Sequence, residues 1–358
     1  MTTPDGVRLA YAVHGEGPPL INVSCWLSHL QFDWESPVWR HLLQDLGAFS
    51  TLVRYDERGS GLSDWRIGDY SVEARTRDLE CVVDALGLER FSLLGISQGG
   101  PIALAYAVRH PDRVSHLVLA GTAARGYLRR GDATPELMVE HETNLNLVRL
   151  GWARENPVFR RVFTNTFIPD ATETQVRWFD DLQRMSTSTE NAVQTRTERA
   201  LVDVSELLPQ VRVPALVFHS RGDDAIPFEE GLLLASRIRG ARFVPLESRN
   251  HILLEDEPAW GRFVAELRGF LTTERAPAVA GAGLPADPEI ESLTDREREI
   301  LVLAAEGLSN QEIGEALTLS VRTVERHFSN IYQRLGISGK AARSAAVARS
   351  VRSAIAAR

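Results

Sequence analysis

The stretch FSLLGISQGGPIA, residues 91–103, decides how the chain folds. Its apolar first half is typical of a buried strand, and its last residues begin a helix rich in small side chains. Between them lies Gly95-Ile96-Ser97-Gln98-Gly99, the Gly-x-Ser-x-Gly pattern of a sharp strand-to-helix turn that exposes a serine hydroxyl. Such a turn excludes side chains two positions from the serine, and glycine occupies both. The alternative is an ordinary turn that contains a serine.

Two later strand ends supply the partners that a serine nucleophile needs. A serine hydroxyl reacts well only when a base takes its proton, and that base needs an orienting carboxylate. The predicted strand 213–219 leads to Asp223 and Asp224, and the last predicted strand leads to His251. These groups lie beyond the carboxyl ends of their strands, in the order serine, acid, histidine. The pattern therefore indicates a nucleophile, an orienting acid and a base.

The rest of the first 271 residues alternates between strand and helix patterns, which predicts βαβ units and a mostly parallel sheet. The expected strands lie at 7–14, 20–23, 50–55, 91–96, 115–120, 213–219 and 242–246, and the expected helices at 36–47, 71–87, 100–110 and 258–271.

Residues 121–212 show no strand pattern and are interpreted as a helical cap over the sheet edge. Among their charged residues are large apolar side chains that together indicate the lid of a roomy apolar pocket. The alternative for any one of them is that it only packs the cap on itself. They are Trp152, Phe159, Phe163, Phe167, Trp178, Phe179 and Met185.

Composition places the chain among globular proteins. It has 358 residues, 44% of them hydrophobic and 25% charged, and no stretch approaches the ~20 apolar residues of a membrane span. The first residues lack the pattern of a signal peptide. The two cysteines, Cys25 and Cys81, form neither a disulfide framework nor a metal-ligand spacing. We therefore expect a cytoplasmic protein with no membrane contact, no metal and no cofactor.

Charge is distributed unevenly near the end of the chain. Residues 272–288 are rich in Ala, Pro and Gly and are interpreted as a flexible linker. Residues 285–321 hold two basic and nine acidic side chains, whereas residues 322–358 hold eight basic and one acidic. The basic end indicates a site for a polyanion.

The residues after the linker predict a helix-turn-helix. Thr294 and Glu297 form one capping box, Ser309 and Glu312 form a second, and Ser320 caps a third, longer helix that ends before Gly336. Two helices joined by a tight turn, the second rich in polar and basic groups, fit a DNA-reading module. On geometry alone, a small helical bundle for protein contact is an equal alternative.

Residues 1–271 resemble an α/β-hydrolase. The resemblance is carried by residues 5–11 (DGVRLAY), 55–63 (YDERGSGLS), the turn at Ser97, Gly222-Asp223 with Pro227 four residues on, and Asn250-His251. It implies Ser97 as nucleophile, Asp223 as orienting acid, with Asp224 as the fallback, and His251 as base. It also implies an oxyanion hole built from the backbone N–H of Gln98 and one from Trp26 or Leu27.

This chain departs from many α/β-hydrolases at Cys25-Trp26, where the relatives have His-Gly. A tryptophan there narrows the oxyanion hole or serves as a ligand wall. Loss of good oxyanion geometry costs roughly 10²–10³ in rate. A competent triad and a binding-only pocket therefore both stay open.

Residues 290–354 resemble the LuxR-type (GerE-like) helix-turn-helix, through LTDRE at 293–297, GLSNQEI at 307–313, SVRTV at 320–324, HFSNI at 327–331 and Leu335-Gly336. The resemblance makes 321–334 the recognition helix. The implied DNA-contacting residues are Asn310, Ser320, Arg322, Thr323, Glu325, Arg326, Asn330 and Lys340. Many relatives carry lysine where this chain has Glu325, and a carboxylate accepts from cytosine N4.

A single module of this size makes too few base contacts for a specific site, so we expect a homodimer on double-stranded DNA. The last predicted helix, 341–355, aligns Val347, Val351 and Ile355 as a candidate dimer seam.

The sequence thus predicts an α/β class fold in two domains. The first, 1–271, has a mostly parallel sheet and a helical cap, and the second, 289–358, is a small all-α helix-turn-helix domain. The leading hypothesis is a transcription regulator that senses a small apolar ester- or lactone-like molecule, with RNA polymerase as a further partner. The alternatives are an active serine hydrolase with a DNA-binding tail, and a hydrolase fold used only as an interaction scaffold.

Overall fold

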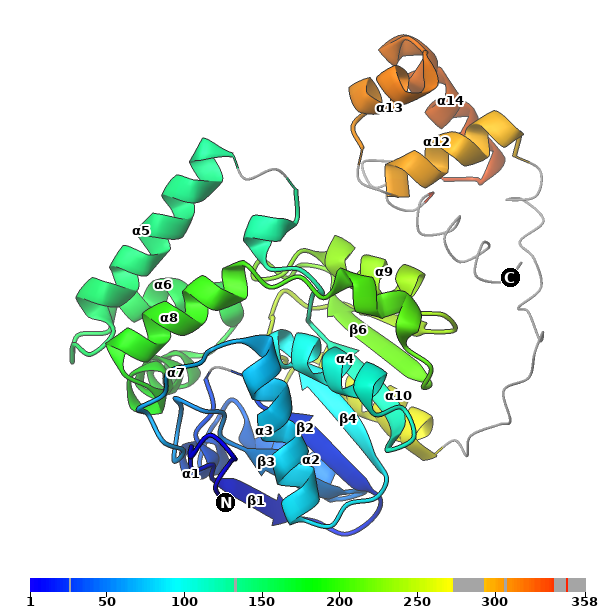
Figure 1. Ribbon diagram of the computed structural model, residues 1–358. Helices are drawn as coiled ribbons and strands as arrows, with labels where there is room; N and C mark the ends of the chain where they lie inside the picture. Colours follow the sequence, from blue (N-terminus) through cyan, green and yellow to red (C-terminus); the bar gives the residue numbers. More distant parts are fainter. Residues whose placement is uncertain (26, 132–133, 273–292, 306–307, 338–345, 347–358) are drawn as a thin grey trace. The chain divides into compact units, whose positions relative to one another are not determined.

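The computed structural model describes residues 1–272, 293–337 and 346, apart from residues 26, 132–133 and 306–307 (Figure 1). The chain divides into two compact units, Met1–Arg275 and Ala276–Arg358. Each unit has hydrophobic clusters of its own. Residues 273–288 of the predicted linker lie outside the described residues, and so does the predicted final helix, with Val347, Val351 and Ile355, apart from residue 346.

The first unit is built on a seven-stranded sheet with the order β1-β3-β2-β4-β5-β6-β7. The edge strand β1 is antiparallel to β3, and every other neighbouring pair is parallel, as predicted. The strands are β1 (Tyr11–His14), β2 (Pro19–Val23), β3 (Thr51–Tyr55), β4 (Phe91–Ile96), β5 (Val114–Ala120), β6 (Ala215–Ser220) and β7 (Arg242–Leu246).

The first strand is shorter than the predicted range 7–14. The backbone N–H of Arg8 donates to Asp64 Oδ2 at 2.8 Å, and that of Ala10 donates to Ser63 Oγ at 3.0 Å. Because side chains of a distant turn take these donors, the segment before Tyr11 does not join the ladder of β3.

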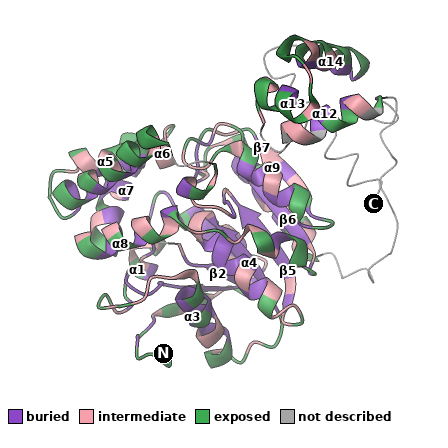
Figure 2. Ribbon diagram, turned by 45° about the horizontal axis from the view of Figure 1, so that its top comes forward, coloured by how far each residue is buried: buried purple, intermediate pink, exposed green. Residues whose placement is uncertain are grey.

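Helices cover both faces of this sheet, so the unit has three layers (Figure 2). Alternate strand residues such as Leu94 and Leu93 point into two separate clusters, as the two-residue period of a strand requires. One cluster is closed by α2 (Arg40–Gly47) and α10 (Pro258–Thr272), and the other by α3 (Val72–Ala85), α4 (Gly100–Arg109) and α9 (Phe228–Arg237). The short helix α1 (Leu30–Trp34) was not predicted.

The segment between β5 and β6 is a helical cap, as predicted, and its described residues form no strand. Its helices are α5 (Pro135–Gly151), α6 (Val158–Phe167), α7 (Glu173–Ser186) and α8 (Thr189–Ala200), with the 3-10 segments η2 (Tyr127–Arg129) and η3 (Ser205–Gln210) (Figure 1). Trp152 and Phe179 of the cap are buried in the cluster that also contains α2 and α10. These two aromatic side chains therefore belong to a cluster shared by the cap and the body of the unit, rather than to a core of the cap alone.

The second unit contains α12 (Asp295–Ala305), α13 (Asn310–Leu317) and α14 (Val321–Arg334). Both predicted capping boxes form, since Ser309 pairs with Glu312, and Thr294 exchanges hydrogen bonds with Glu297. Between α13 and α14, Thr318 adopts a left-handed backbone with φ of 55°. Buried side chains from all three helices, among them Ile300, Ile313, Val324, Phe328 and Ile331, hold the unit together.

Candidate active site and DNA-binding surface

The turn after β4 holds Ser97 in a strained position. Ser97 has φ of 49°, a left-handed conformation that costs about 1–3 kcal/mol in a residue other than glycine. It opens the 3-10 turn η1 (Ser97–Gly99), which runs directly into α4. A Cβ placed on Gly99 would lie 2.5 Å from the carbonyl oxygen of Val23, so the residue there must be glycine for the turn to pack against β2. The turn is thus stabilised by its surroundings.

A second contact holds the turn from β5. The hydroxyl of Thr122, just beyond that strand, donates to the backbone carbonyl of Ser97. A Cβ on Gly100 would collide with this threonine side chain. The serine hydroxyl is therefore presented by a backbone that two neighbouring strands constrain.

Three side chains from three strand ends form one hydrogen-bonded chain. His251 Nε2 lies 2.8 Å from Ser97 Oγ, and His251 Nδ1 lies 2.7 Å from Asp223 Oδ2. The side chains of His251 and Asp223 are 1% and 0% exposed. With Nδ1–H donating to the carboxylate, Nε2 is free to accept the serine proton, which is the geometry of an activated nucleophile.

Asp223, rather than Asp224, is placed to hold the histidine. Asp223 Oδ1 accepts from the backbone N–H groups of Ala225 and Ile226 at 2.8 and 3.0 Å, whereas Asp224 is exposed. Burial opposes ionisation of Asp223, but the charge and hydrogen bond of His251 and the Ile226 amide outweigh it. The pKa of Asp223 is therefore lower than that of an ordinary aspartate.

A second buried histidine lies beside Asp223 and was not predicted. His219 Nε2 donates to the carbonyl of Ile226 at 2.9 Å and lies 3.7 Å from Asp223 Oδ2. Burial lowers the pKa of His219, which favours the neutral ring. His219 therefore holds the turn that carries the acid. The sequence shows it only as a polar residue inside a buried strand.

The predicted oxyanion hole is described in part. Gln98 lies in η1, at the start of a helix, where backbone N–H groups have no partner within the helix. Leu27 is buried at 4% exposure, and Trp26 lies outside the described residues. Arg199 of α8 donates to the side-chain oxygen of Gln98, a contact that no local sequence pattern indicates.

The cap touches the histidine directly. The carbonyl of Phe167, at the end of α6, accepts from the backbone N–H groups of His251 and Ile252 at 2.9 and 3.2 Å. The rings of Phe167 and His251 lie 5.5 Å apart. The cap therefore borders the three-residue chain and fixes the loop that carries its base.

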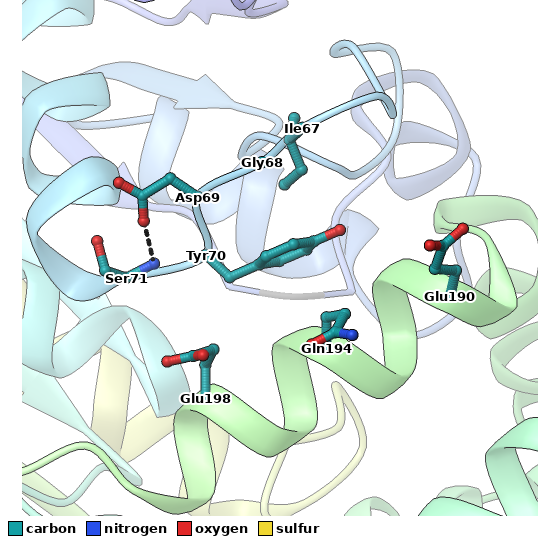
Figure 3. A pocket seen from close by; sticks show the side chains of 8 residues that line it. All are labelled: Ile67, Gly68, Asp69, Tyr70, Ser71, Glu190, Gln194 and Glu198. Atoms are coloured by element: carbon teal, nitrogen blue, oxygen red, sulfur yellow. Dashed lines mark hydrogen bonds between the residues drawn. The ribbon is translucent and has the colours of Figure 1, made fainter.

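Two cavities in the described part of the first unit differ in character. One, of about 30 Å³, has His251 in its wall and is mostly apolar, with Trp39, Phe218 and Trp260 among its lining residues. The other, of about 390 Å³, is polar and contains none of the three chain residues in its wall (Figure 3). Figure 3 shows Glu190, Gln194 and Glu198 along α8, facing the segment of Asp69 and Tyr70.

Neither metal ligation nor a membrane span is found in the described part of the chain. No group of three or more His, Cys, Asp or Glu side chains there is arranged to hold a metal ion. None of the helices described is both long and apolar enough to cross a bilayer. Cys25 and Cys81 are both free thiols.

In the second unit, α14 presents a polar face. Arg322, Glu325, Arg326 and Asn330 are exposed, whereas Val324, Phe328 and Ile331 pack inward. Thr323 and Asn310 are partly buried, and Lys340 lies outside the described residues.

Ser320, also predicted to touch DNA, accepts from the backbone N–H of Thr323 at 3.1 Å and so caps α14. The exposed residues form the face that a helix in a DNA groove requires.

Two family models match the chain. Residues 18–258 match the model described as alpha/beta hydrolase fold, and residues 291–345 match that described as bacterial regulatory proteins, luxR family.

Individual proteins resemble the first part of the chain. The 2-hydroxymuconate semialdehyde hydrolase of Pseudomonas sp. (strain CF600) is 28% identical over 284 residues, which cover 75% of this chain and 88% of that protein. An esterase from Exiguobacterium antarcticum has a TM-score of 0.66 at 25% identity, covering 76% of this chain and 98% of that one. The enol-lactonase from Burkholderia xenovorans LB400 gives 0.60 at 25% identity, with coverages of 76% and 98%.

Proposed function

The chain belongs to the alpha/beta hydrolase fold family and joins this domain to a luxR-family DNA-binding domain, and we propose that it is a ligand-responsive transcription regulator. In this proposal residues 1–271 bind a small, largely apolar ester or lactone, and residues 289–358 bind double-stranded DNA. The observation that carries it is the hydrogen-bonded chain Ser97–His251–Asp223 in the same polypeptide as a helix-turn-helix.

The ligand class follows from the chemistry of that chain. A serine hydroxyl bonded to an imidazole nitrogen is suited to attack on an acyl carbon, and the similar esterase and enol-lactonase are named for such substrates. The cap supplies apolar walls beside the histidine through Phe167. These features support an ester or lactone as the ligand.

If the ligand is hydrolysed, each residue of the hydrogen-bonded chain has a defined step. Ser97 Oγ attacks the acyl carbon while His251 Nε2 takes its proton, and Asp223 stabilises the imidazolium. The backbone N–H of Gln98, with that of Leu27 or Trp26, holds the developing oxyanion. The leaving alcohol takes the proton from His251. Water then attacks the acyl carbon of the acyl-enzyme while His251 takes its proton, and Ser97 leaves with that proton.

The DNA-binding half of the proposal rests on α14. Its exposed Arg322, Arg326 and Asn330 are suited to base edges and phosphates. Specific sites need ~4–10 kcal/mol over bulk DNA, which two modules supply more readily than one. We therefore propose a homodimer on paired half-sites, acting in the cytoplasm beside RNA polymerase.

The second candidate function is an active serine hydrolase whose DNA-binding tail controls its own gene or its location. The two hydrogen bonds of His251 favour it, because they complete a proton path from Ser97 that a receptor that only binds does not need.

One experiment on the full chain separates the two functions. Hydrolysis of p-nitrophenyl butyrate and of simple lactones is measured for the wild type and Ser97→Ala, together with the Kd for promoter DNA with and without each compound. A regulator shows a Kd that shifts with at least one compound. Rapid hydrolysis with an unchanged Kd supports the second function, and no duplex binding at low salt overturns the first. Native mass spectrometry of protein purified from its host identifies a bound ligand.

A further inference from the structure

Helix α8 of the cap is attached to the body of the first unit along one face. Asn191, Thr195 and Arg199 recur every four residues and so lie on the same side of the helix. Asn191 Nδ2 donates to the carbonyl of Gly59 at 3.0 Å, and Thr195 Oγ1 accepts from Arg75 at 3.3 Å. These two contacts reach only the segment of Gly59 and helix α3.

The third residue of this face, Arg199, reaches further. Its Nη2 donates to both carboxylate oxygens of Glu57 at 2.6 Å, and its Nη1 donates to the side-chain oxygen of Gln98. The side chains of Arg199 and Glu57 are 9% and 2% exposed. A guanidinium holds two acceptors at once in a fixed plane, so this pairing determines where the Gln98 side chain lies.

Glu57 links the Arg199 guanidinium to the segment that is proposed to supply the second oxyanion donor, Trp26 or Leu27. Its backbone N–H donates to Ser24 Oγ at 3.2 Å, and Ser24 begins the segment that contains Trp26 and Leu27. Arg199 thus stands between the two segments expected to supply oxyanion donors, one carrying Gln98 and one following Ser24. None of its contacts is to Ser97, His251 or Asp223 in the described structure.

We propose that Arg199 is a positioning residue that makes the oxyanion hole depend on the placement of cap helix α8, by fixing Gln98 against Glu57. The inference rests on the proposed chemistry of Ser97 and adds a cap residue to it. When α8 is in place, Arg199 holds the Gln98 side chain, and this restrains the residue whose backbone N–H is the proposed oxyanion donor. A shift of α8 would release the Gln98 side chain and weaken the hole, although the Ser97–His251–Asp223 chain stays intact.

The ionic character of the contact supports this role. Burial lowers the pKa of Arg199 to about 10, and the Glu57 carboxylate works against this lowering, so the guanidinium is charged at neutral pH. A neutral side chain of similar length would fill the space without holding either acceptor.

The test uses full-length Arg199→Met and Arg199→Lys, with Arg75→Met as the matched control. Arg75 donates to the same Glu57 carboxylate at 2.9 Å and to α8, but not to Gln98. Two readouts are taken: kcat and KM for p-nitrophenyl butyrate, and the rate at which a fluorophosphonate phosphonylates Ser97 with release of fluoride. Thermal unfolding and active-site titration correct each rate for the folded fraction.

Arg199→Met is expected to lower kcat and the phosphonylation rate about 10–100-fold with KM within about threefold, because misplacing an oxyanion donor weakens only the transition state. Arg199→Lys can still donate to one of the two acceptors, so its kcat and phosphonylation rate should lie between those of wild type and Arg199→Met. Arg75→Met loses thermal stability and keeps its corrected kcat within about threefold. Equal corrected rates for wild type and Arg199→Met, or equal losses in Arg199→Met and Arg75→Met, overturn the proposal.

A double-mutant cycle separates positioning from packing. If Arg199 acts through the Gln98 side chain, Gln98→Ala alone reduces kcat similarly, and the double variant is no slower than either single one. Additive losses overturn the proposal. If the wild type does not react with fluorophosphonate at all, the proposed ester chemistry is overturned as well. If wild type and Arg199→Met react equally fast, only the inference about Arg199 is overturned.

Discussion

Nε2 of His251 lies 2.8 Å from Oγ of Ser97, although 154 residues separate them in the chain. The contact forms because β4 and the segment after β7 both end at the same edge of a parallel sheet. The ring is held from its other side by Asp223, so one tautomer and one orientation are selected.

Replacing Ser97 tests whether its hydroxyl is the nucleophile. Ser97→Ala is expected to reduce ester hydrolysis at least about 10³-fold, because the acyl-enzyme route is lost and only binding and oxyanion contacts remain. The measurement is the initial rate with p-nitrophenyl butyrate. Retention of more than a tenth of the wild-type rate would assign the activity to another group.

Ser97→Gly tests the strain in the same turn. Glycine adopts a φ of 49° without steric cost, so the free energy of unfolding should rise by roughly 1 kcal/mol while hydrolysis is lost. Denaturant unfolding of both proteins measures the difference. A less stable glycine variant would show that the serine contacts outweigh the backbone strain.

Asp223 makes a contribution to the free energy of unfolding that is lost in acid. Its pKa is lowered in the folded state, so the ionised group stabilises the fold above the unfolded pKa of ~3.9, and this stability is lost as pH falls through the lower folded value. Asp223→Asn is expected to lower kcat roughly 10⁴-fold. Its stability deficit relative to wild type should narrow between about pH 6 and pH 2.5 in denaturant titrations, and a constant deficit would contradict the assignment.

Glu325 is an acidic group on the exposed face of α14. Glu325→Gln is expected to strengthen binding to any duplex and to change preference at one base position by about 1–3 kcal/mol, since a carboxylate only accepts hydrogen bonds, as from cytosine N4, whereas an amide also donates. Binding is compared across single-base variants of the operator at fixed salt. Glu206→Gln, the same charge change on exposed η3, is the control and should leave the base preference unaltered.

Phe328 tests whether the two units are energetically separate. It is 3% exposed in the cluster of the second unit, so Phe328→Ala should cost about 3–5 kcal/mol there and abolish DNA binding. Ester hydrolysis by the same protein should stay within about twofold of wild type. A parallel loss of hydrolysis would show that the first unit needs the second to fold.

The parts of this fold that could be predicted are those with local signals. The turn at Ser97 is indicated by Gly95 and Gly99. The helix starts of the second unit are indicated by the pairs Thr294–Glu297 and Ser309–Glu312. The acid and the histidine were predicted from their position after strands, and the structure places His251 beside Ser97 and Asp223 beside His251.

What could not be predicted depends on contacts between distant segments. Arg199 lies 101 residues from Gln98 and 142 from Glu57, and in sequence it is one of two arginines in a charged helix. His219 looks like an ordinary polar residue in a strand until the turn of Asp223 folds over it. The first strand was overextended because its alternation does not reveal that Ser63 and Asp64 take its amide hydrogens.

The glycines around Ser97 also limit how this protein could be re-engineered as a covalent receptor. Gly99 faces a carbonyl and Gly100 a threonine at contact distance, so neither position accepts a side chain. A designer can exchange the nucleophilic atom at position 97, for example for sulfur, but cannot change the angle from which it attacks. New ligand selectivity would therefore have to come from cap side chains that contact neither the sheet nor the loop of His251.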